Sequence, residues 1–481
     1  MLRKAATVRY LSYMFGTLFT IINLFLIVTY LDIFQFAVWG VANSLIYVFS
    51  QFGQLTYVQY IEKYFPTLSK EKMNYYLYKF IKTISSLTIV WLLVLFVLDY
   101  FGYFNKYNAE NLYILFLIVS LLTTVESIIE VSSKYLLALK ETKKLDVYEL
   151  FIFKFLRLII FFLLLINNFS IYYLLLTNLI IRSVFLVAVL NYNRVGIVHI
   201  IKSVYKSKIF DDNFKQLSYT SIAFIIKSMQ VTFLNVIFLI LTIFSENETI
   251  AKYSLGILII NNMKPIFASL SSLLLPIISV NIKEKKDNSE LLKLVIMVNS
   301  VIISVLVMIS LLITEYQFII SFFLNDFDES IYTIIVLAVY VSAILMFYYP
   351  EFINLLFSNY ERQLFYFMLL NYSLCLGGYY LFSKKYELNI LLFYLLFDLL
   401  NLIFTKYLHR KISSTRFFRQ IGITFWLVTG FVFFTAIDFD FNLSFSLIFF
   451  LMFLIYDLNK LKNNLKSYDL LKEVDEKSEQ Y

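Results

Sequence analysis

Long apolar segments recur along the whole chain and are separated by short polar connections. Each is long enough to cross a hydrocarbon core of about 30 Å, so the pattern predicts about fourteen membrane-spanning helices. Their expected ranges are 10–30, 36–60, 80–98, 112–133, 147–166, 171–190, 217–244, 251–279, 291–313, 331–357, 364–382, 389–405, 421–437 and 443–456. We therefore expect an all-α polytopic membrane protein whose connections are too short to hold a soluble domain.

The distribution of basic residues predicts the orientation of these helices. Lysine and arginine concentrate in alternate connections such as 63–79, 134–144 and 194–215, whereas the intervening connections are mainly polar or acidic. Because basic connections stay on the cytoplasmic side, both termini are expected in the cytoplasm. This asymmetry also accounts for the net charge of +8, so binding to nucleic acid is an unnecessary explanation.

The number of helices suggests two halves. Six predicted helices precede Leu217, and six follow it before the basic connection 406–420, which predicts two six-helix lobes in one orientation around a central cavity. A short likeness between Arg9–Tyr13 and Lys215–Tyr219, each at the start of a lobe, supports the repeat. The expected divisions are 1–212 and 213–412 for the lobes, 413–456 for two additional helices and 457–481 for a cytoplasmic tail.

Composition agrees with a membrane protein and excludes several kinds of site. The chain is 60% hydrophobic and only 15% charged, with a mean hydropathy of +0.77. Its single cysteine, Cys375, rules out a disulfide framework, and His199 and His409 lie in basic connections, so no metal or cofactor is expected. The low glycine content, 10 residues, argues against close glycine-mediated packing as the main contact between helices.

Common enzyme motifs are missing from the sequence. No phosphate-binding loop, nucleophile elbow or zinc-protease motif occurs, which favours a non-enzymatic protein. A membrane polysaccharide polymerase or glycosyltransferase is the enzymatic alternative. Such an enzyme needs a larger external connection than any predicted here, and the best enzyme-like segment, Asn325–Glu329, is more consistent with a solvated loop.

Charged residues inside the predicted spans are the main candidates for function. A charge at the centre of a spanning helix costs about 2.5–3.5 kcal/mol, so its presence calls for a partner or a function. The deep cations are Lys154, Arg157, Arg182, Lys227 and Lys264, and the deep anions are Glu126, Glu130 and Asp398.

These charges have two interpretations. Glu126 and Glu130 could simply pair with Lys154 and Arg157 between neighbouring helices. The cations outnumber the anions, however, and Lys227 has no acidic residue in its own span, nor does Lys264. The alternative is that the surplus cations line an aqueous cavity and bind an anionic substrate.

Uncharged polar residues in the second, seventh and eighth spans extend this hypothesis. Either they form hydrogen bonds between helices, or they face a wet cavity. A cationic and amide-rich cavity suits a substrate with a phosphate or carboxylate and many hydroxyl groups. The candidates are Gln51, Gln54, Gln230, Asn235 and Asn261.

Three segments resemble a known family. Phe52–Tyr60 is similar to the close of its second span, Ala251–Leu255 with Pro265 and Pro276 to its eighth span, and Phe322–Phe327 to its loop before the tenth span. With its overall topology, the chain resembles the Wzx-type polysaccharide flippases of the multidrug/oligosaccharidyl-lipid/polysaccharide exporter (MOP) superfamily.

The resemblance implies a function and a set of partners. The expected function is translocation of undecaprenyl-pyrophosphate-linked oligosaccharide repeat units across the bacterial inner membrane by alternating access, for O-antigen or capsule synthesis. Expected partners are the lipid-linked oligosaccharide, membrane lipids and the polysaccharide polymerase with its chain-length machinery. The acidic residue late in the family's seventh span is absent here, where Asn235 lies in that region. The remaining candidates for ion coupling, or else for salt bridges, are Glu126, Glu130 and Asp398.

The superfamily also contains other exporters. A flippase for a lipid-linked peptidoglycan precursor is compatible with the same charges. A multidrug antiporter is disfavoured, because cationic drugs favour acidic cavities and the predicted cavity is cationic.

Overall fold

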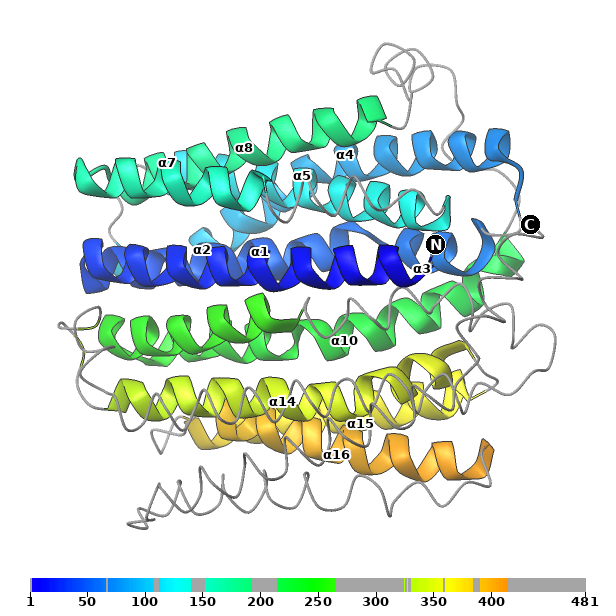
Figure 1. Ribbon diagram of the computed structural model, residues 1–481. Helices are drawn as coiled ribbons and strands as arrows, with labels where there is room; N and C mark the ends of the chain where they lie inside the picture. The colour runs from blue at the N-terminus through cyan, green and yellow to red at the C-terminus, as the bar shows by residue number, and fades with distance from the viewer. Residues whose placement is uncertain are drawn as a thin grey trace. The chain divides into compact units, whose positions relative to one another are not determined.

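The computed structural model describes residues 2–65, 68–107, 112–139, 152–192, 214–264, 324, 327, 330–357, 360–383 and 390–412. These residues are helical apart from short turns, and no strand occurs among them, which confirms the predicted all-α class (Figure 1). An unlabelled helical segment covers 247–264. The labelled helices are α1 Leu2–Tyr30, α2 Ile33–Gly53, α3 Tyr57–Tyr64, α4 Lys70–Tyr100, η2 Asn105–Tyr107, α5 Leu112–Ala138, α7 Lys154–Ile166, α8 Ile171–Tyr192, α10 Phe214–Phe244, α14 Ser330–Phe357, α15 Glu361–Ser383 and α16 Ile390–Ile412.

The described helices include many that fit a membrane. Seven of them are long and apolar enough to span a bilayer, as expected of a polytopic membrane protein. The predicted spans 291–313, 421–437 and 443–456 lie outside the described residues, as do Pro265 and Pro276. The total of about fourteen spans therefore stays a prediction.

The chain divides into two compact units. The larger unit comprises Ser12–Leu255 and Glu361–Ile390, and the other comprises Met1–Leu11, Gly256–Tyr360 and Leu391–Tyr481. In the larger unit, α5 packs against α2, α4 and α8, while α10 packs against α2, α3 and α15. The predicted boundaries of the two lobes remain a prediction.

The second predicted helix, 36–60, is interrupted, which corrects the sequence-based expectation. α2 ends at Gly53, Leu55 adopts a left-handed φ of 49°, and α3 begins at Tyr57. The break gives the chain after α2 a new direction, so Tyr57 does not continue the helical face that carries Gln51.

The C-terminal end of α2 is in close contact with α5. A Cβ atom on Gly53 would lie 2.6 Å from Oγ of Ser127 in α5, so only glycine fits without displacement. The same Ser127 hydroxyl donates a hydrogen bond to the carbonyl oxygen of Ser50 at 3.1 Å. This close approach holds the end of α2 against α5, and α3 follows directly beside α5 and α10.

A second glycine allows close packing within the larger unit. A Cβ atom on Gly40 in α2 would overlap the side chain of Ser254 in the helical segment 247–264. Although glycine is scarce in the sequence, Gly40 and Gly53 both lie at points of closest helix approach. Two of the few glycines therefore allow neighbouring helices to approach closely.

Candidate functional site

A buried carboxylate joins three helices of the larger unit. Oε1 of Glu62 in α3 lies 3.0 Å from Nζ of Lys134 in α5 and 3.7 Å from Nζ of Lys227 in α10. The Glu62 side chain is only 6% exposed, and each lysine side chain is 15% exposed. Two ammonium groups therefore share one carboxylate, and we call these three residues the Glu62 cluster.

Sequence analysis missed this counter-ion. Glu62 follows the second predicted span and lies among the basic residues of a connection, so it was not counted as a deep anion. Lys227 was expected without an acidic partner, and the structure corrects this, because α3 brings Glu62 back against α10. The available signal was a glutamate directly after the second predicted span, at the start of a basic connection.

Glu130 lies at the edge of the same cluster. Its Oε1 is 3.8 Å from Nζ of Lys134, one helical turn away in α5, and its side chain is 43% exposed. Pairing of Glu130 with Lys154 or Arg157 was one of the two interpretations of these charges, and the ion pair observed is with Lys134 instead. Lys134 is nearer because it lies one helical turn along the same helix.

The ionisation of Glu62 is set by its two lysines. Burial by itself raises the pKa of its carboxyl, but the ammonium groups of Lys227 and Lys134 outweigh burial and hold the pKa below its ordinary value. Glu62 is therefore ionised at neutral pH. Glu130, at the edge of the Glu62 cluster, is a second carboxyl group that interacts with both lysines.

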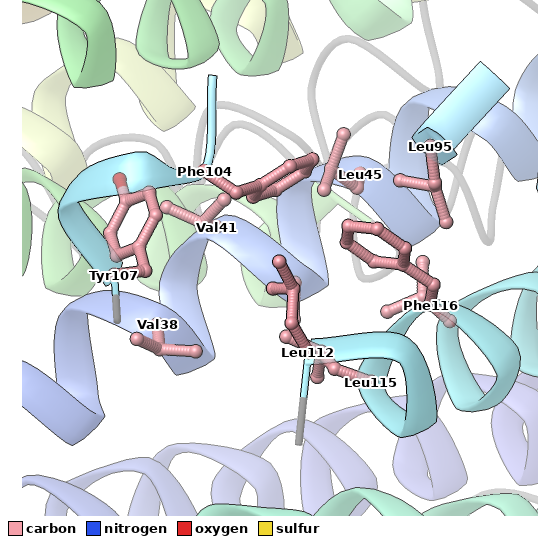
Figure 2. A pocket seen from close by; sticks show the side chains of 11 residues that line it. Val38, Val41, Leu45, Leu95, Phe104, Tyr107, Leu112, Leu115 and Phe116 are labelled. Carbon is pink, nitrogen blue, oxygen red and sulfur yellow. The ribbon is translucent and has the colours of Figure 1, made fainter. Parts of the chain in front are cut away.

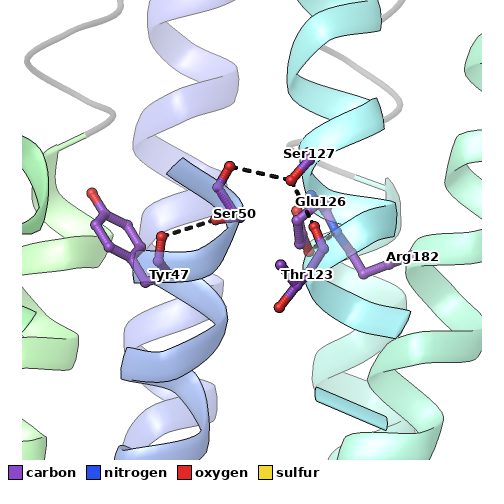
Figure 3. A network of polar contacts seen from close by, with 6 residues as sticks. All are labelled: Tyr47, Ser50, Thr123, Glu126, Ser127 and Arg182. Carbon is purple, nitrogen blue, oxygen red and sulfur yellow. Dashed lines mark hydrogen bonds and ion pairs between the residues drawn. The ribbon is translucent and has the colours of Figure 1, made fainter. Parts of the chain in front are cut away.

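A second cluster connects α5 with α8 (Figure 3). Arg182 donates from Nε to Oε1 of Glu126 at 2.5 Å, and its Nη2 donates to Oε2 of the same carboxylate. This two-point pairing is the strong geometry for arginine and carboxylate. An interhelical pair involving Glu126 was one of the two expected interpretations, but the partner is Arg182 rather than Lys154 or Arg157. The reason is that α5 packs directly against α8.

Arg157 adds a further positive charge beside this pair. It is close enough to interact electrostatically with both Arg182 and Glu126. Its Nε is buried and has no hydrogen-bond partner among the residues that the structure describes. Two guanidinium groups thus share the charge of one carboxylate, as two ammonium groups do in the Glu62 cluster.

The other unit contains a separate group of buried polar residues. Asp398 in α16 is fully buried and accepts a hydrogen bond of 2.5 Å from the hydroxyl group of Tyr348 in α14. Nζ of Lys264 lies 5.3 Å from the ring centre of Tyr394 and 3.5 Å from Oδ1 of Asn261. Lys264 also interacts electrostatically with Asp398, so two residues that were predicted in different roles belong to one group.

A buried ion pair in the same unit escaped sequence analysis. Nζ of Lys406 lies 2.6 Å from Oε2 of Glu351, and their side chains are 7% and 1% exposed. Lys406 had been assigned to a cytoplasmic connection, whereas Glu351 lies inside the predicted span 331–357 and was overlooked. With the Tyr348–Asp398 hydrogen bond, this pair connects α14 to α16.

The remaining candidates differ in burial. Gln54, Gln230 and Asn235 are buried, and Gln51, Lys154 and Asn261 are partly buried. Burial against neighbouring helices suits interhelical contacts, and the role of these residues in lining a cavity stays a prediction.

One pocket lies apart from all of these groups (Figure 2). It is lined by apolar side chains such as Val41, Leu95 and Phe116, together with Tyr107. Its volume of about 10 Å³ has room for about one water molecule. This pocket is therefore a gap in the packing rather than a substrate site. Among the described residues, no group of histidine, cysteine or acidic side chains could hold a metal ion.

Comparison with known protein families and with curated proteins finds no match. Solved structures do match the fold. The chain is similar to a MATE protein in complex with MaD3S, with 12% identity and a TM-score of 0.58 over 86% of this chain and 97% of the other. It is also similar to the lipid II flippase MurJ in an inward closed conformation, with 14% identity and a TM-score of 0.56 over 97% and 100%.

A third neighbour is an inward-facing multidrug resistance MATE family transporter of the MOP superfamily, with 12% identity and a TM-score of 0.52 over 85% and 99%. All three neighbours are transporters or flippases rather than enzymes. The chain therefore has the multi-pass helical fold that is found in transporters and flippases of the MOP superfamily.

Proposed function

We propose that this protein is a flippase for undecaprenyl-pyrophosphate-linked oligosaccharide repeat units, acting across the bacterial inner membrane in O-antigen or capsule synthesis. One observation carries the proposal. In the larger unit, cations gather in two pairs inside the protein: Lys134 and Lys227 lie beside Glu62, with Glu130 at the edge, and Arg157 and Arg182 lie beside Glu126.

Cations inside a membrane protein are costly, which makes paired lysines and paired arginines candidates for ligand contacts. Removing a charge from water is unfavourable, and a nearby anion offsets that cost. Lysine attracts phosphate as a point charge, and arginine attracts it through a planar pair of donors. The diphosphate of a lipid-linked sugar is an anion that these side chains attract, and its sugar hydroxyls suit amides such as Gln51.

The position of the Glu62 cluster fits uptake from the inner leaflet. Glu62 follows α2, Lys134 is near the end of α5, and Lys227 is in the first half of α10. The predicted orientation places these three regions toward the cytoplasm. A head group that arrives from that side would meet the Glu62 cluster first, while its lipid tail stays in the bilayer. The two predicted lobes would then open the cavity to each side of the membrane in turn.

Two other transport functions have specific support. The similarity to MurJ extends over 97% of this chain, so a lipid-linked peptidoglycan precursor is the closest alternative substrate. The similarity to MATE proteins supports a multidrug antiporter, but the lysines and arginines gathered beside Glu62 and Glu126 disfavour a cationic drug. A glycosyltransferase or polymerase has no solved neighbour among these structures.

Complementation tests the proposal. A strain that lacks its polysaccharide flippase is supplied with this protein, with Lys227→Ala or with the matched control Lys252→Ala. Lys252 pairs with the exposed Glu248 one helical turn away, so its replacement leaves the Glu62 cluster intact. We expect surface glycan with the wild type and the control, and little with Lys227→Ala at equal abundance.

The same design separates the alternatives. Rescue of a strain depleted of its peptidoglycan-precursor flippase, without rescue of surface glycan, would identify the other lipid-linked substrate. Full surface glycan with Lys227→Ala would contradict the role of the Glu62 cluster.

A further inference from the structure

One face of α4 is basic at its first end and apolar at its other end. The opposite face is buried in a core cluster that joins α4 to α5, with residues such as Leu77 and Ile84. The outer face follows the spacing of three and four residues that keeps side chains on one side of a helix. We call it the α4 stripe, and in chain order it comprises Lys72, Tyr75, Lys79, Lys82, Ser86, Ile89, Leu93, Phe96 and Tyr100.

The apolar end of the α4 stripe is open to its surroundings. The exposed fractions are 68% for Ile89, 58% for Leu93 and 86% for Tyr100. Large apolar side chains on the outside of a spanning helix belong in hydrocarbon rather than in water. Ser86, where the two ends of the stripe meet, donates a hydrogen bond of 2.7 Å to the carbonyl oxygen of Thr83 in the same helix. This end of the stripe therefore faces the acyl chains of the bilayer.

The basic end of the α4 stripe extends beyond the hydrocarbon. α4 has 31 residues and is therefore about 46 Å long, whereas the hydrocarbon core is about 30 Å thick, so about ten residues project from it. The predicted span 80–98 and the predicted orientation put these residues on the cytoplasmic side. Lys79 and Lys82 then lie at the level where the head groups of the inner leaflet begin. Tyr75, 47% exposed, lies one turn further out, at the depth where tyrosine is favoured.

Positive charge dominates this end of the helix. Residues 70–82 contain four lysines and one acidic residue, Glu71, which lies in the first turn. Lys72 and Lys79 form no ion pair with any acidic side chain that the structure describes. The nearby carboxylates of α3 and α5 have cations of their own, since their ion pairs are Glu62 with Lys134 and Lys227, Glu130 with Lys134 and Glu126 with Arg182.

We propose that the α4 stripe binds an anionic phospholipid of the inner leaflet. Its phosphate group contacts Lys79 and Lys82, and its acyl chains lie along Ile89 and Leu93. The stripe has the same order of parts as such a lipid, with charge at the membrane surface and apolar side chains beneath it. This inference rests on the orientation of α4 and is independent of the substrate that the protein transports.

The chemistry of lysine explains the preference for an anionic lipid. A lysine near a membrane surface is attracted to negatively charged head groups, and its flexible apolar stem lets the ammonium group reach them from the edge of the hydrocarbon. A phosphatidylcholine head group carries its own cation beside the phosphate, which opposes the lysines. A phosphatidylglycerol head group has no such cation, so its negative charge is available to Lys79 and Lys82.

Lipid binding to the purified, full-length protein tests this inference. The probes are phosphatidylglycerol and phosphatidylcholine with the same acyl chains, titrated into detergent micelles and counted on the intact protein by native mass spectrometry. The test variant is Lys79→Gln with Lys82→Gln. Its control, Lys252→Gln with Arg362→Gln, also removes two cations. Arg362 is exposed at the start of α15, and Lys252 pairs with Glu248, so both lie outside the α4 stripe.

We expect the wild type and the control to bind phosphatidylglycerol about tenfold or more tightly than phosphatidylcholine. The Lys79→Gln, Lys82→Gln variant should lower this preference to about twofold or less. Lys79→Arg with Lys82→Arg should keep it, because the charge is kept. Equal binding of the two lipids by the wild type, or an undiminished preference in the glutamine variant, would overturn the inference.

Two further measurements keep the test decisive. If the double glutamine variant does not fold, Lys79→Gln alone should lower the preference by about threefold, and an unchanged preference would overturn the inference. Glycerophosphoglycerol has the phosphatidylglycerol head group without acyl chains and should not displace the lipid at equal concentration. Displacement would show that the site takes a free phosphate group and would overturn its assignment to a lipid.

Discussion

The ammonium group of Lys227 in α10 lies 3.7 Å from the carboxylate of Glu62 in α3. Glu62 is shared with Lys134, and Glu130 lies at the edge of the same cluster. This relationship gives Lys227 a structural partner, and under the proposed function Lys227 also contacts the anionic head group.

Replacing Lys227 with Met should reduce stability only modestly. Glu62 keeps its 3.0 Å contact with Lys134, so the expected loss in the free energy of unfolding is about 1–3 kcal/mol. Thermal unfolding of the purified protein in detergent measures this loss, with Lys252→Met as the control. If Lys227→Met is as stable as the wild type and binds a prenyl diphosphate sugar equally well, then Lys227 contributes neither to stability nor to diphosphate binding.

Glu126→Gln should be more harmful, because it leaves the guanidinium groups of Arg157 and Arg182 close together without their carboxylate. Breaking a buried ion pair by removing one partner costs about 3–5 kcal/mol. Adding Arg157→Gln to Glu126→Gln should then recover part of the lost stability, since it removes the like-charge repulsion. The free energies of unfolding of the double variant and of each single variant measure this recovery. If Arg157→Gln lowers the stability of Glu126→Gln as much as it lowers that of the wild type, then Glu126 and Arg157 do not interact.

Gly40→Ala should destabilise the larger unit despite the better helix propensity of alanine. Its Cβ would overlap the side chain of Ser254, and forcing extra volume into a packed contact costs about 1–3 kcal/mol. Gly377→Ala is the matched control, because its Cβ would meet no atom within 4 Å. Melting temperatures of the two variants should differ, with Gly40→Ala the lower, and equal values would refute the close approach of α2 to segment 247–264.

The stability of the Glu62 cluster should depend on acid pH. The folded-state pKa of Glu62 is below its ordinary value of 4.5, so the carboxylate stabilises the fold above pH 4.5, and that contribution is lost as the pH falls through the folded-state value. Between pH 6 and about pH 3, wild-type stability should fall more steeply than that of Glu62→Gln. Parallel curves for the two proteins would contradict an ionised, lysine-bound Glu62.

Much of the fold follows from the apolar pattern. α10 at Phe214–Phe244 matches the expected span 217–244, and α8 at Ile171–Tyr192 matches 171–190. Length and hydropathy are enough for these helices, because each is one continuous helix of mainly apolar residues. The break after Gly53 was not predicted, since the apolar pattern does not show that Leu55 adopts a left-handed φ.

The candidate site was only partly predictable for the same reason. The unusual charges of Glu126, Arg182 and Lys227 were evident from their depth in apolar runs. Their partners were not, because pairing depends on which helices are neighbours. Glu62 was hidden by its position in a basic connection, and only the turn that begins α3 brings it against α10.

Translocation by the purified protein tests the central claim most directly. Vesicles containing the protein receive a fluorescent prenyl diphosphate oligosaccharide in one leaflet, and a membrane-impermeant glycosidase reports its arrival in the other. The account predicts faster transfer than in protein-free vesicles, with the rate reduced at least about tenfold by Lys227→Ala and unchanged by Lys252→Ala. Transfer no faster than in protein-free vesicles, from protein with the native melting temperature, would contradict it.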